Sequence, residues 1–104
     1  MRVIAKSTIN LWREKYPKAS GALQAWVEII QSRDFKHFPD LKSAFGSADL
    51  VKKDRVVFNI KGNHFRLVAG VDFQRQAVLT IWFGTHQEYD KINPAEVAYE
   101  HPSH

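Results

Sequence analysis

The chain has 104 residues, 44% of them hydrophobic and 12% aromatic, with a formal net charge of +4 and no cysteine. The apolar content excludes an intrinsically disordered chain, and the length suits a single domain over residues 1–104 with one modest core. The lack of cysteine excludes disulfides, thiolate metal sites and a cysteine nucleophile, and the positive charge favours a polyanionic partner.

No targeting or membrane-spanning segment is predicted. The apolar run in residues 1–6 is too short for a signal peptide, and no stretch approaches the roughly 20 apolar residues of a membrane span. A chain without cysteine also suits a reducing compartment. We therefore expect a cytoplasmic protein that does not contact a membrane.

The first third of the chain predicts a strand and a helical hairpin. A short strand at residues 2–5 precedes a helix-start signal at Ser7, and Pro17 closes this helix because proline cannot continue it. A second helix begins near Ser20. Apolar residues recur at helical spacing in both, namely Ile9, Trp12 and Tyr16 in the first helix and Leu23, Trp26, Val27 and Ile30 in the second.

A polar stretch, residues 33–54, follows the helices. Asp40 is a candidate cap for one helical turn that runs through Phe45. This stretch and its border are the most basic part of the chain, and such lysines usually form a solvated face, although they also suit phosphate contact. The cations are Lys42, Lys52, Lys53 and Arg55.

The block from Arg55 to Tyr89 organises the rest of the chain. Its β-branched and aromatic runs, interrupted by two short turns, predict a three-stranded antiparallel meander. The runs are residues 56–60, 64–73 and 77–83, and the turns are residues 61–63 and 74–75.

Alternation along the middle strand separates two faces of this sheet. The apolar face holds Phe65, Leu67, Ala69, Val71 and Phe73, and the mixed face holds His64, Arg66, Val68, Gly70 and Asp72. We therefore predict a two-layer α+β fold, in which an N-terminal strand and a helical hairpin pack on one face of an antiparallel sheet. The two helical indoles should lie on the apolar face.

Residues 93–104 follow the meander and its polar extension. Asn93 and Pro94 form a helix-start signal, with proline at the first helical position. We expect this segment to form a short helix or a tail.

Four basic and aromatic side chains should converge at one end of the mixed face. In an antiparallel sheet the start of the middle strand lies near the end of the last strand. The four are Lys61, Arg66, His86 and Tyr89. This mixture suits cleavage of RNA by its own 2′-hydroxyl, which needs a base, cationic donors for the phosphorane oxygens and an acid at the leaving 5′-oxygen.

No metal or cofactor site is predicted. The five histidines lack metal-ligand spacing, and no glycine-rich phosphate loop or serine elbow is visible. Each catalytic candidate also has a structural alternative: Lys61 could be a solvated turn residue, Arg66 could pair with Asp72, His86 could cap a turn, and Tyr89 could close the edge of a core.

Three segments in this order and spacing resemble the HigB family of toxins from bacterial type II toxin–antitoxin modules. They are VFNIKGN at residues 57–63, FRLV at residues 65–68 and FGTHQEYDKI at residues 83–92. The likeness extends upstream to Ala25-Trp26 and to LKSAF at residues 41–45, and so covers nearly the whole chain.

The resemblance implies a RelE/ParE-like fold and a toxic mRNA interferase, a metal-independent endoribonuclease that cuts messenger RNA during translation on the ribosome. It also implies neutralisation by a HigA antitoxin, a helix-turn-helix protein, and contact with operator DNA only through the antitoxin complex. The net charge is low for capture of free RNA, so the ribosome should position the substrate and cleavage of naked RNA should be weak.

The family pattern adds further positions to the predicted site. It falls on Asn59, Lys61, Asn63 and Arg66 in the first two strands of the meander, and on His86, Glu88 and Tyr89 after the third. The resemblance leads us to assign Arg66 and Lys61 to phosphate stabilisation and His86 or Tyr89 to proton transfer, with Asn59, Asn63 and Glu88 as RNA contacts. Two rival functions are a non-enzymatic toxin of the same fold, as in the gyrase-directed ParE group, and an inactive RNA-binding module.

Overall fold

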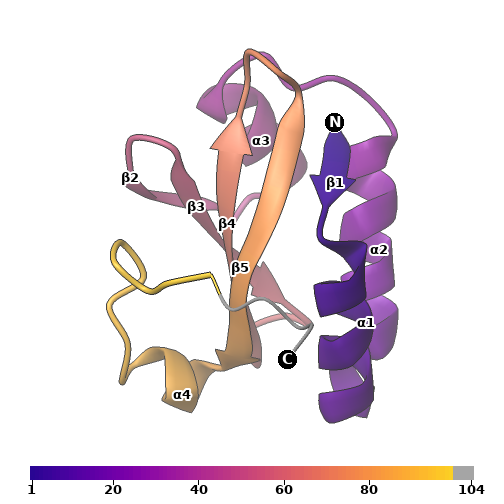
Figure 1. Cartoon of the computed structure of the whole chain (residues 1–104), viewed down its shortest axis with the longest axis vertical. Helices are drawn as coiled ribbons and strands as arrows, with labels where there is room; N and C mark the ends of the chain where they lie inside the picture. The colour runs from indigo at the N-terminus through magenta and orange to yellow at the C-terminus, as the bar shows by residue number, and fades with distance from the viewer. Residues whose placement is uncertain (100–104) are drawn as a thin grey trace.

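The structure, a computed structural model, describes residues 1–99 and consists of a five-stranded sheet with a helical hairpin on one face (Figure 1). Its elements in chain order are β1 (Arg2–Ile4), α1 (Lys6–Lys15), the 3-10 helix η1 (Pro17–Ala19), α2 (Ser20–Gln31), α3 (Phe38–Ala44), β2 (Asp49–Lys52), β3 (Arg55–Ile60), β4 (Phe65–Asp72), β5 (Ala77–Thr85) and α4 (His86–Tyr89). Within residues 1–99, the helices are all too short or too polar to cross a membrane.

The sheet has the strand order β1-β5-β4-β3-β2. The predicted meander is confirmed, because β3, β4 and β5 pair antiparallel in sequence. The sheet as a whole is mixed, since β1 joins the outer edge of β5 in parallel, with Val3 opposite Val78. Strand β2 was not predicted; it lies in the polar stretch and pairs with β3 at the other edge.

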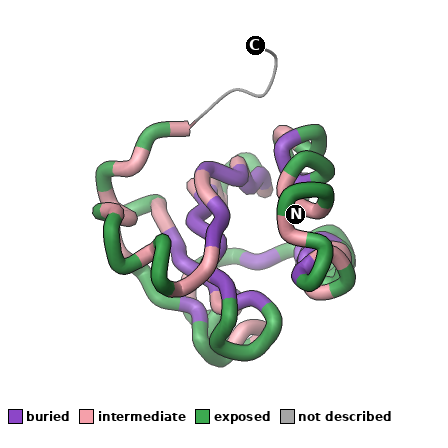
Figure 2. Tube along the Cα trace, turned by 90° about the horizontal axis from the view of Figure 1, so that it is seen from below, coloured by how far each residue is buried: buried purple, intermediate pink, exposed green. Residues whose placement is uncertain are grey.

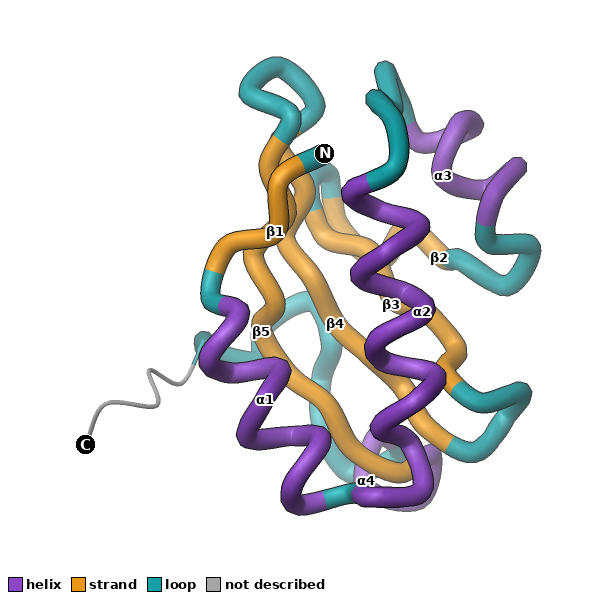
Figure 3. Tube along the Cα trace, turned by 90° about the vertical axis from the view of Figure 1, so that its right-hand side faces the viewer, coloured by secondary structure: helices purple, strands orange, loops and turns teal. Residues whose placement is uncertain are grey.

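The helical hairpin covers one face of the sheet, as predicted (Figure 3). The indole of Trp26 packs edge-on against Phe58, with ring centroids 5.4 Å apart, and that of Trp12 stacks on Phe83 at 5.6 Å. The α+β layer prediction and the placement of both indoles on the apolar face are therefore confirmed. Burial of these large side chains is the main stabilising term of the fold.

The two faces of β4 differ as the alternation predicted. Phe65, Leu67, Ala69 and Val71 belong to the main core under the helices, while Val68 points into a second, smaller cluster with Val57 and Ile81. A β-bulge at Ile81 brings this side chain into the second cluster, because the register of β4 and β5 shifts there by one residue. The buried segments of the sheet lie between the helices on one side and the C-terminal segment on the other (Figure 2).

The C-terminal segment packs across the second cluster rather than forming a helix. Residues 94–96 form a hydrogen-bonded turn, and Val97 and Tyr99 lie against the second cluster. Arg55 holds the segment by donating to the carbonyl oxygens of Pro94 and Val97, at 3.1 and 2.8 Å. Of the two predicted alternatives, the described part of this segment is a tail; residues 100–104 lie outside the described residues.

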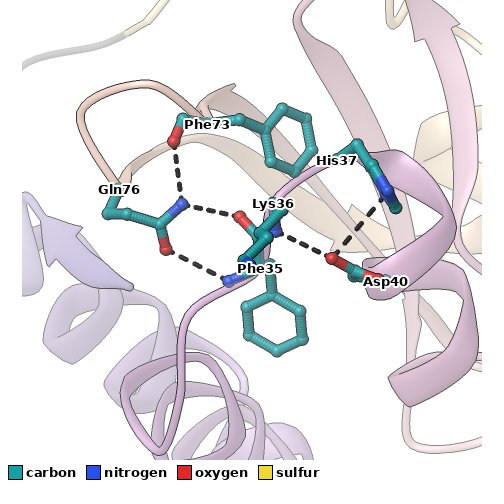
Figure 4. Close-up of polar contacts among 6 residues, drawn as sticks. All are labelled: Phe35, Lys36, His37, Asp40, Phe73 and Gln76. Carbon is teal, nitrogen blue, oxygen red and sulfur yellow. Dashed lines mark hydrogen bonds and ion pairs between the residues drawn. The ribbon is translucent and has the colours of Figure 1, made fainter.

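The prediction that Asp40 caps a helix from outside was wrong. Helix α3 begins at Phe38 because Pro39 occupies its first turn, a position that proline favours. Asp40 therefore lies inside the first turn, where its carboxylate accepts the Lys36 backbone N–H at 2.8 Å and faces His37 at 3.7 Å (Figure 4).

Gln76 joins the turn between β4 and β5 to the stretch before α3. Its side-chain amide donates to the carbonyl oxygens of Phe35, at 2.6 Å, and Phe73, at 2.8 Å, and its oxygen accepts the Phe35 N–H at 3.1 Å (Figure 4). The backbone of Gln76 is left-handed, with φ of 53°. One side chain thus satisfies three polar backbone groups at the end of the sheet away from α4.

We expect Gln76→Ala to lower the free energy of unfolding by about 2–3 kcal/mol, because three partly buried hydrogen bonds are lost. Urea denaturation monitored by circular dichroism measures this. Gln74→Ala, at an exposed position of the same turn, is the control and should change stability by less than about 0.5 kcal/mol. Equal effects of the two substitutions would contradict the role assigned to Gln76.

Candidate active site

The candidate site lies at the end of the sheet where β4 starts and β5 stops. Phe65 pairs with Thr85, and the His86 N–H donates to the carbonyl oxygen of His64 at 3.0 Å. The predicted convergence of these two chain segments is thus confirmed. Helix α4 and the segment after it lie on the opposite side of the sheet from α1 and α2 (Figure 1).

Helix α4 carries His86 and Tyr89, and a capping box holds it in place. The hydroxyl oxygen of Thr85 accepts the Glu88 N–H at 3.1 Å, and the Glu88 carboxylate accepts the Thr85 N–H at 2.8 Å. This helix was not predicted from the sequence. Its signal was present, because Thr85-His86-Gln87-Glu88 fits the capping-box pattern of Ser or Thr followed by Glu three residues later.

Asn63 holds the guanidinium of Arg66, and Asn59 in turn contacts Asn63. Its Nη2 donates to Asn63 Oδ1 at 2.9 Å and its Nη1 to the Asn63 carbonyl oxygen at 3.1 Å, while Asn59, opposite Arg66 on β3, donates to the same Oδ1 at 3.4 Å. Within residues 1–99 no carboxylate pairs with Arg66, so the alternative of an Arg66–Asp72 pair is not what the structure contains. The positive charge is held in place and left available to an anion.

Tyr89 lies between this arginine and an indole. The Arg66 guanidinium carbon is 5.9 Å from the centre of the Tyr89 ring, and the Trp82 ring lies 6.2 Å away on β5. Burial, followed by the charge of Asp49, raises the pKa of Tyr89, and the nearby Arg66 opposes this only in part. The hydroxyl therefore stays protonated at neutral pH and can donate a proton or a hydrogen bond.

Lys61 and His64 lie in the loop between β3 and β4. Lys61 has φ of 54° and Gly62 has φ of 64°, so two successive left-handed residues turn the chain. Both Lys61 and His64 are exposed, and across residues 1–99 their side chains make no hydrogen bond or ion pair. Lys61 is thus a free cation beside the Asn63–Arg66 contacts. Nowhere in the same range do three or more metal-ligating side chains gather around one point.

Three of the four cations predicted as phosphate contacts have partners within the fold. Lys42 donates to the Ala48 carbonyl oxygen at 2.9 Å, Lys52 lies 3.9 Å from the Glu96 carboxylate, and Arg55 holds the C-terminal segment. Lys53, in the turn between β2 and β3, is exposed. Of these four cations, Lys53 is therefore the most available to a phosphate, whereas Arg55 holds the C-terminal segment against the sheet.

Besides the Thr85 N–H of the capping box, the Glu88 carboxylate has a second hydrogen-bond donor, the hydroxyl of Tyr16. The hydroxyl of Tyr16, the residue that ends α1, donates to the Glu88 carboxylate at 3.0 and 3.3 Å. The Thr85 N–H lowers the pKa of Glu88 most, followed by the Tyr16 hydroxyl. Burial, with a further contribution from Glu88, raises the pKa of Tyr16 to about 12. The carboxylate predicted as an RNA contact is thus occupied by protein donors.

Comparisons with known proteins identify the family of the chain. Residues 19–92 match the family model described as the HigB toxin, the RelE-like toxic component of a toxin–antitoxin system. The chain belongs to the HigB toxin family. The resemblance noted in the sequence is therefore confirmed, and this family description implies an antitoxin partner.

Curated relatives support the same assignment. The chain is 36% identical to the mRNA interferase toxin HigB of Escherichia coli strain K12 over 92 residues, which cover 86% of this chain and 88% of the relative. It is 28% identical to the mRNA interferase HigB of Escherichia coli O6:H1 strain CFT073 over 94 residues, covering 88% and 91%. The mRNA interferase HigB of Shigella flexneri is 36% identical, with 86% and 88% covered.

Gly84, opposite Arg66 on β5, leaves no room for a side chain. A Cβ there would lie 2.7 Å from the Trp82 ring and 3.0 Å from the Glu88 carboxylate. We expect Gly84→Ala to displace one of them and to lower the free energy of unfolding by about 1–3 kcal/mol, as overpacking does. Thermal denaturation and tryptophan fluorescence measure these effects. Gly46→Ala, where the added carbon meets open space, should alter neither, and similar results for both variants would contradict the close packing at Gly84.

The lowered pKa of Glu88 gives α4 a pH dependence. A carboxyl whose pKa is lower in the folded protein adds stability above its ordinary pKa of 4.5, and this stability is lost as the pH falls through the lowered folded value. We expect the amide resonances of residues 85–89 to report this loss in a nuclear magnetic resonance titration below about pH 4.5. Glu88→Gln should abolish it, and an unchanged acid response in that variant would contradict the assignment.

Proposed function

We propose that this chain is an mRNA interferase that cuts messenger RNA during translation. The observation that carries the proposal is the Arg66 guanidinium, which Asn63 holds beside Tyr89 with no neutralising carboxylate among residues 1–99. A fixed cation next to proton-transfer groups stabilises the charge that develops on phosphate oxygens in the transition state. The relatives named above as mRNA interferases support the same reaction.

The reaction needs no covalent enzyme intermediate. A base removes the proton of the 2′-hydroxyl, the 2′-oxygen attacks the adjacent phosphorus, and the bond from phosphorus to the 5′-oxygen breaks as that oxygen takes a proton. The products are a 2′,3′-cyclic phosphate and a free 5′-hydroxyl. Arg66, assisted by Lys61, stabilises the phosphorane oxygens, and neither step requires a metal ion or a cofactor.

The two proton transfers fall to His86 and Tyr89. The raised pKa of Tyr89 favours the protonated phenol, which suits the acid at the departing 5′-oxygen. His86 lies one helical turn earlier on α4, and its imidazole nitrogen can accept a proton, so we assign it as the base at the 2′-hydroxyl. Asn59 and Asn63 then act mainly by holding Arg66.

The partners follow from the charge and from the family. A net charge of +4 is small for capture of free RNA, so the ribosome supplies the positioning of the messenger and Lys53 contacts ribosomal RNA phosphate. We assign neutralisation to a HigA antitoxin, a helix-turn-helix protein through which the complex reaches operator DNA. The activity belongs in the cytoplasm, where messages are translated.

We expect Arg66→Ala to reduce cleavage of a translated reporter about 100-fold and His86→Ala to reduce it at least tenfold, because each loses a group that acts in the transition state. Primer extension on the reporter after induction in a heterologous bacterium measures the cuts. Arg75→Ala is the matched control, since the side chain of this arginine is 82% exposed in the turn at the other end of the sheet and, among residues 1–99, pairs only with Asp72.

The outcomes separate the proposal from its rivals. Discrete cuts that depend on translation, persist in Arg75→Ala and disappear in the two site variants support the interferase. Growth arrest with intact messenger would overturn it and favour a toxin with another target. Arrest and cuts undiminished in both site variants would overturn the assignment of the site.

A further inference from the structure

Tyr16 joins two parts of the molecule that lie on opposite sides of the sheet. It ends α1 in the helical layer, and its hydroxyl reaches a carboxylate 72 residues later, on α4. The end of α1 and helix α4 both lie at the lower end of the molecule in Figure 1, where β5 stops. A single hydrogen-bonded group thus links the helical layer to the helix that carries His86 and Tyr89.

Aromatic packing fixes the position of the Tyr16 ring. The ring lies edge-on to Phe65 at 5.6 Å and to Phe83 at 5.5 Å, and these two phenylalanines stack on each other at 5.4 Å. Phe65 immediately precedes Arg66, and Phe83 immediately precedes Gly84. The Tyr16 hydroxyl is therefore held in a fixed position relative to β5 and to β4, the strand that carries Arg66.

The hydrogen bond between Tyr16 and Glu88 is charge-assisted. The pKa of Tyr16 is raised to about 12 and that of Glu88 is lowered, so the phenol remains a donor and the carboxylate an acceptor throughout the neutral range. The same carboxylate accepts the Thr85 N–H. Glu88 therefore connects Tyr16 directly to the first residue before α4.

Helix α4 depends on such contacts because it has only four residues. A helix of one turn gains too few internal hydrogen bonds to offset the cost of its nucleation, so its position is set by capping and by packing. On the sheet side, Tyr89 packs against Trp82 and Arg66. On the side of the helical layer, the contact is the Tyr16 hydroxyl.

We propose that Tyr16 is a positioning residue of the active site: its hydroxyl holds Glu88, and through Glu88 it sets the placement of His86 and Tyr89 relative to Arg66. This inference rests on the proposed function. It assigns Glu88 to the positioning of α4 in place of contact with RNA. It also gives α1 a part in catalysis, although none of its residues belongs to the site.

The test uses Tyr16→Phe, which removes the hydroxyl and keeps the ring in its aromatic contacts. We expect the single-turnover cleavage rate at saturating concentrations of programmed ribosomes to fall about five- to tenfold, with the half-saturating concentration unchanged, because binding is retained and the geometry of proton transfer is lost. Ser20→Ala is the matched control: it removes the hydrogen bond from Arg13 Nε, 2.8 Å long, between α1 and α2. It should lower stability slightly and leave the rate unchanged.

A spectroscopic measurement tests the link without activity. In Tyr16→Phe, the carbon-13 titration of the Glu88 carboxyl should shift to higher pH, because one hydrogen-bond donor to the ionised form is lost. Amide exchange in residues 85–89 should accelerate relative to Ser20→Ala. A merely structural role for Tyr16 would lower stability without either change being specific to α4.

A failure of the proposed function and a failure of the positioning role of Tyr16 would give different results. A wild-type protein that does not cut messenger overturns the proposed function, and the positioning role falls with it. A wild-type protein that cuts, with a Tyr16→Phe variant that cuts equally fast, overturns the positioning role alone. An unchanged Glu88 titration, or a change in half-saturation without a change in rate, also overturns it.

Discussion

The pairing of β4 with β5 is the constraint on which the rest of the structure depends. It sets Phe65 opposite Thr85 and Arg66 opposite Gly84, so that the guanidinium and the start of α4 share one end of the sheet. The same pairing stacks Phe65 on Phe83 in the core below. A slip of one residue would exchange the two faces of β4 and would bury Arg66 among the helices. The hydrophobic alternation that specifies the core therefore also specifies the site.

The surroundings of Arg66 show how a cation can be held without being neutralised. An aspartate at position 63 would form an ion pair and cancel the charge, whereas the Asn63 amide accepts the same hydrogen bond and remains neutral. The Tyr89 ring adds a cation–π contact, which orients the guanidinium without adding a negative charge. This arrangement is less stabilising than a bidentate carboxylate pair, but it leaves the arginine able to bind phosphate.

Much of the fold could be predicted from the sequence because its signals are local. The period of two in residues 64–73 and the helical spacing of Ile9 with Trp12 and of Leu23 with Trp26 each depend on one segment, and the predicted strand and helices were confirmed. Strand β2 was missed because it has only four residues, two of them charged, and it forms at the edge of the sheet by pairing with β3. Helix α4 was missed although its capping box is visible, since four residues give no periodicity.

Some features of the candidate site could likewise be predicted from local sequence patterns, and others could not. Convergence of His86 with the start of β4 followed from antiparallel geometry, which a sequence can supply. The partners of Arg55 and Glu88 could not be predicted, because they come from residues 94–97 and from Tyr16, which are far away in the chain. Long-range contacts of this kind depend on how layers pack, and no pattern within one segment records them.

A carboxylate in the proposed RNA site presents an electrostatic conflict, and the contacts of Glu88 reduce it. In the proposed site, a carboxylate without hydrogen-bond donors would repel the scissile phosphate. The Glu88 oxygens instead face the Thr85 N–H and the Tyr16 hydroxyl, whose dipoles offset part of the negative charge. The negative charge is also complementary to the N-terminal end of α4, where the N–H groups carry partial positive charge. Glu88 can therefore stabilise α4 while Arg66, on the neighbouring strand, dominates the field that a phosphate encounters.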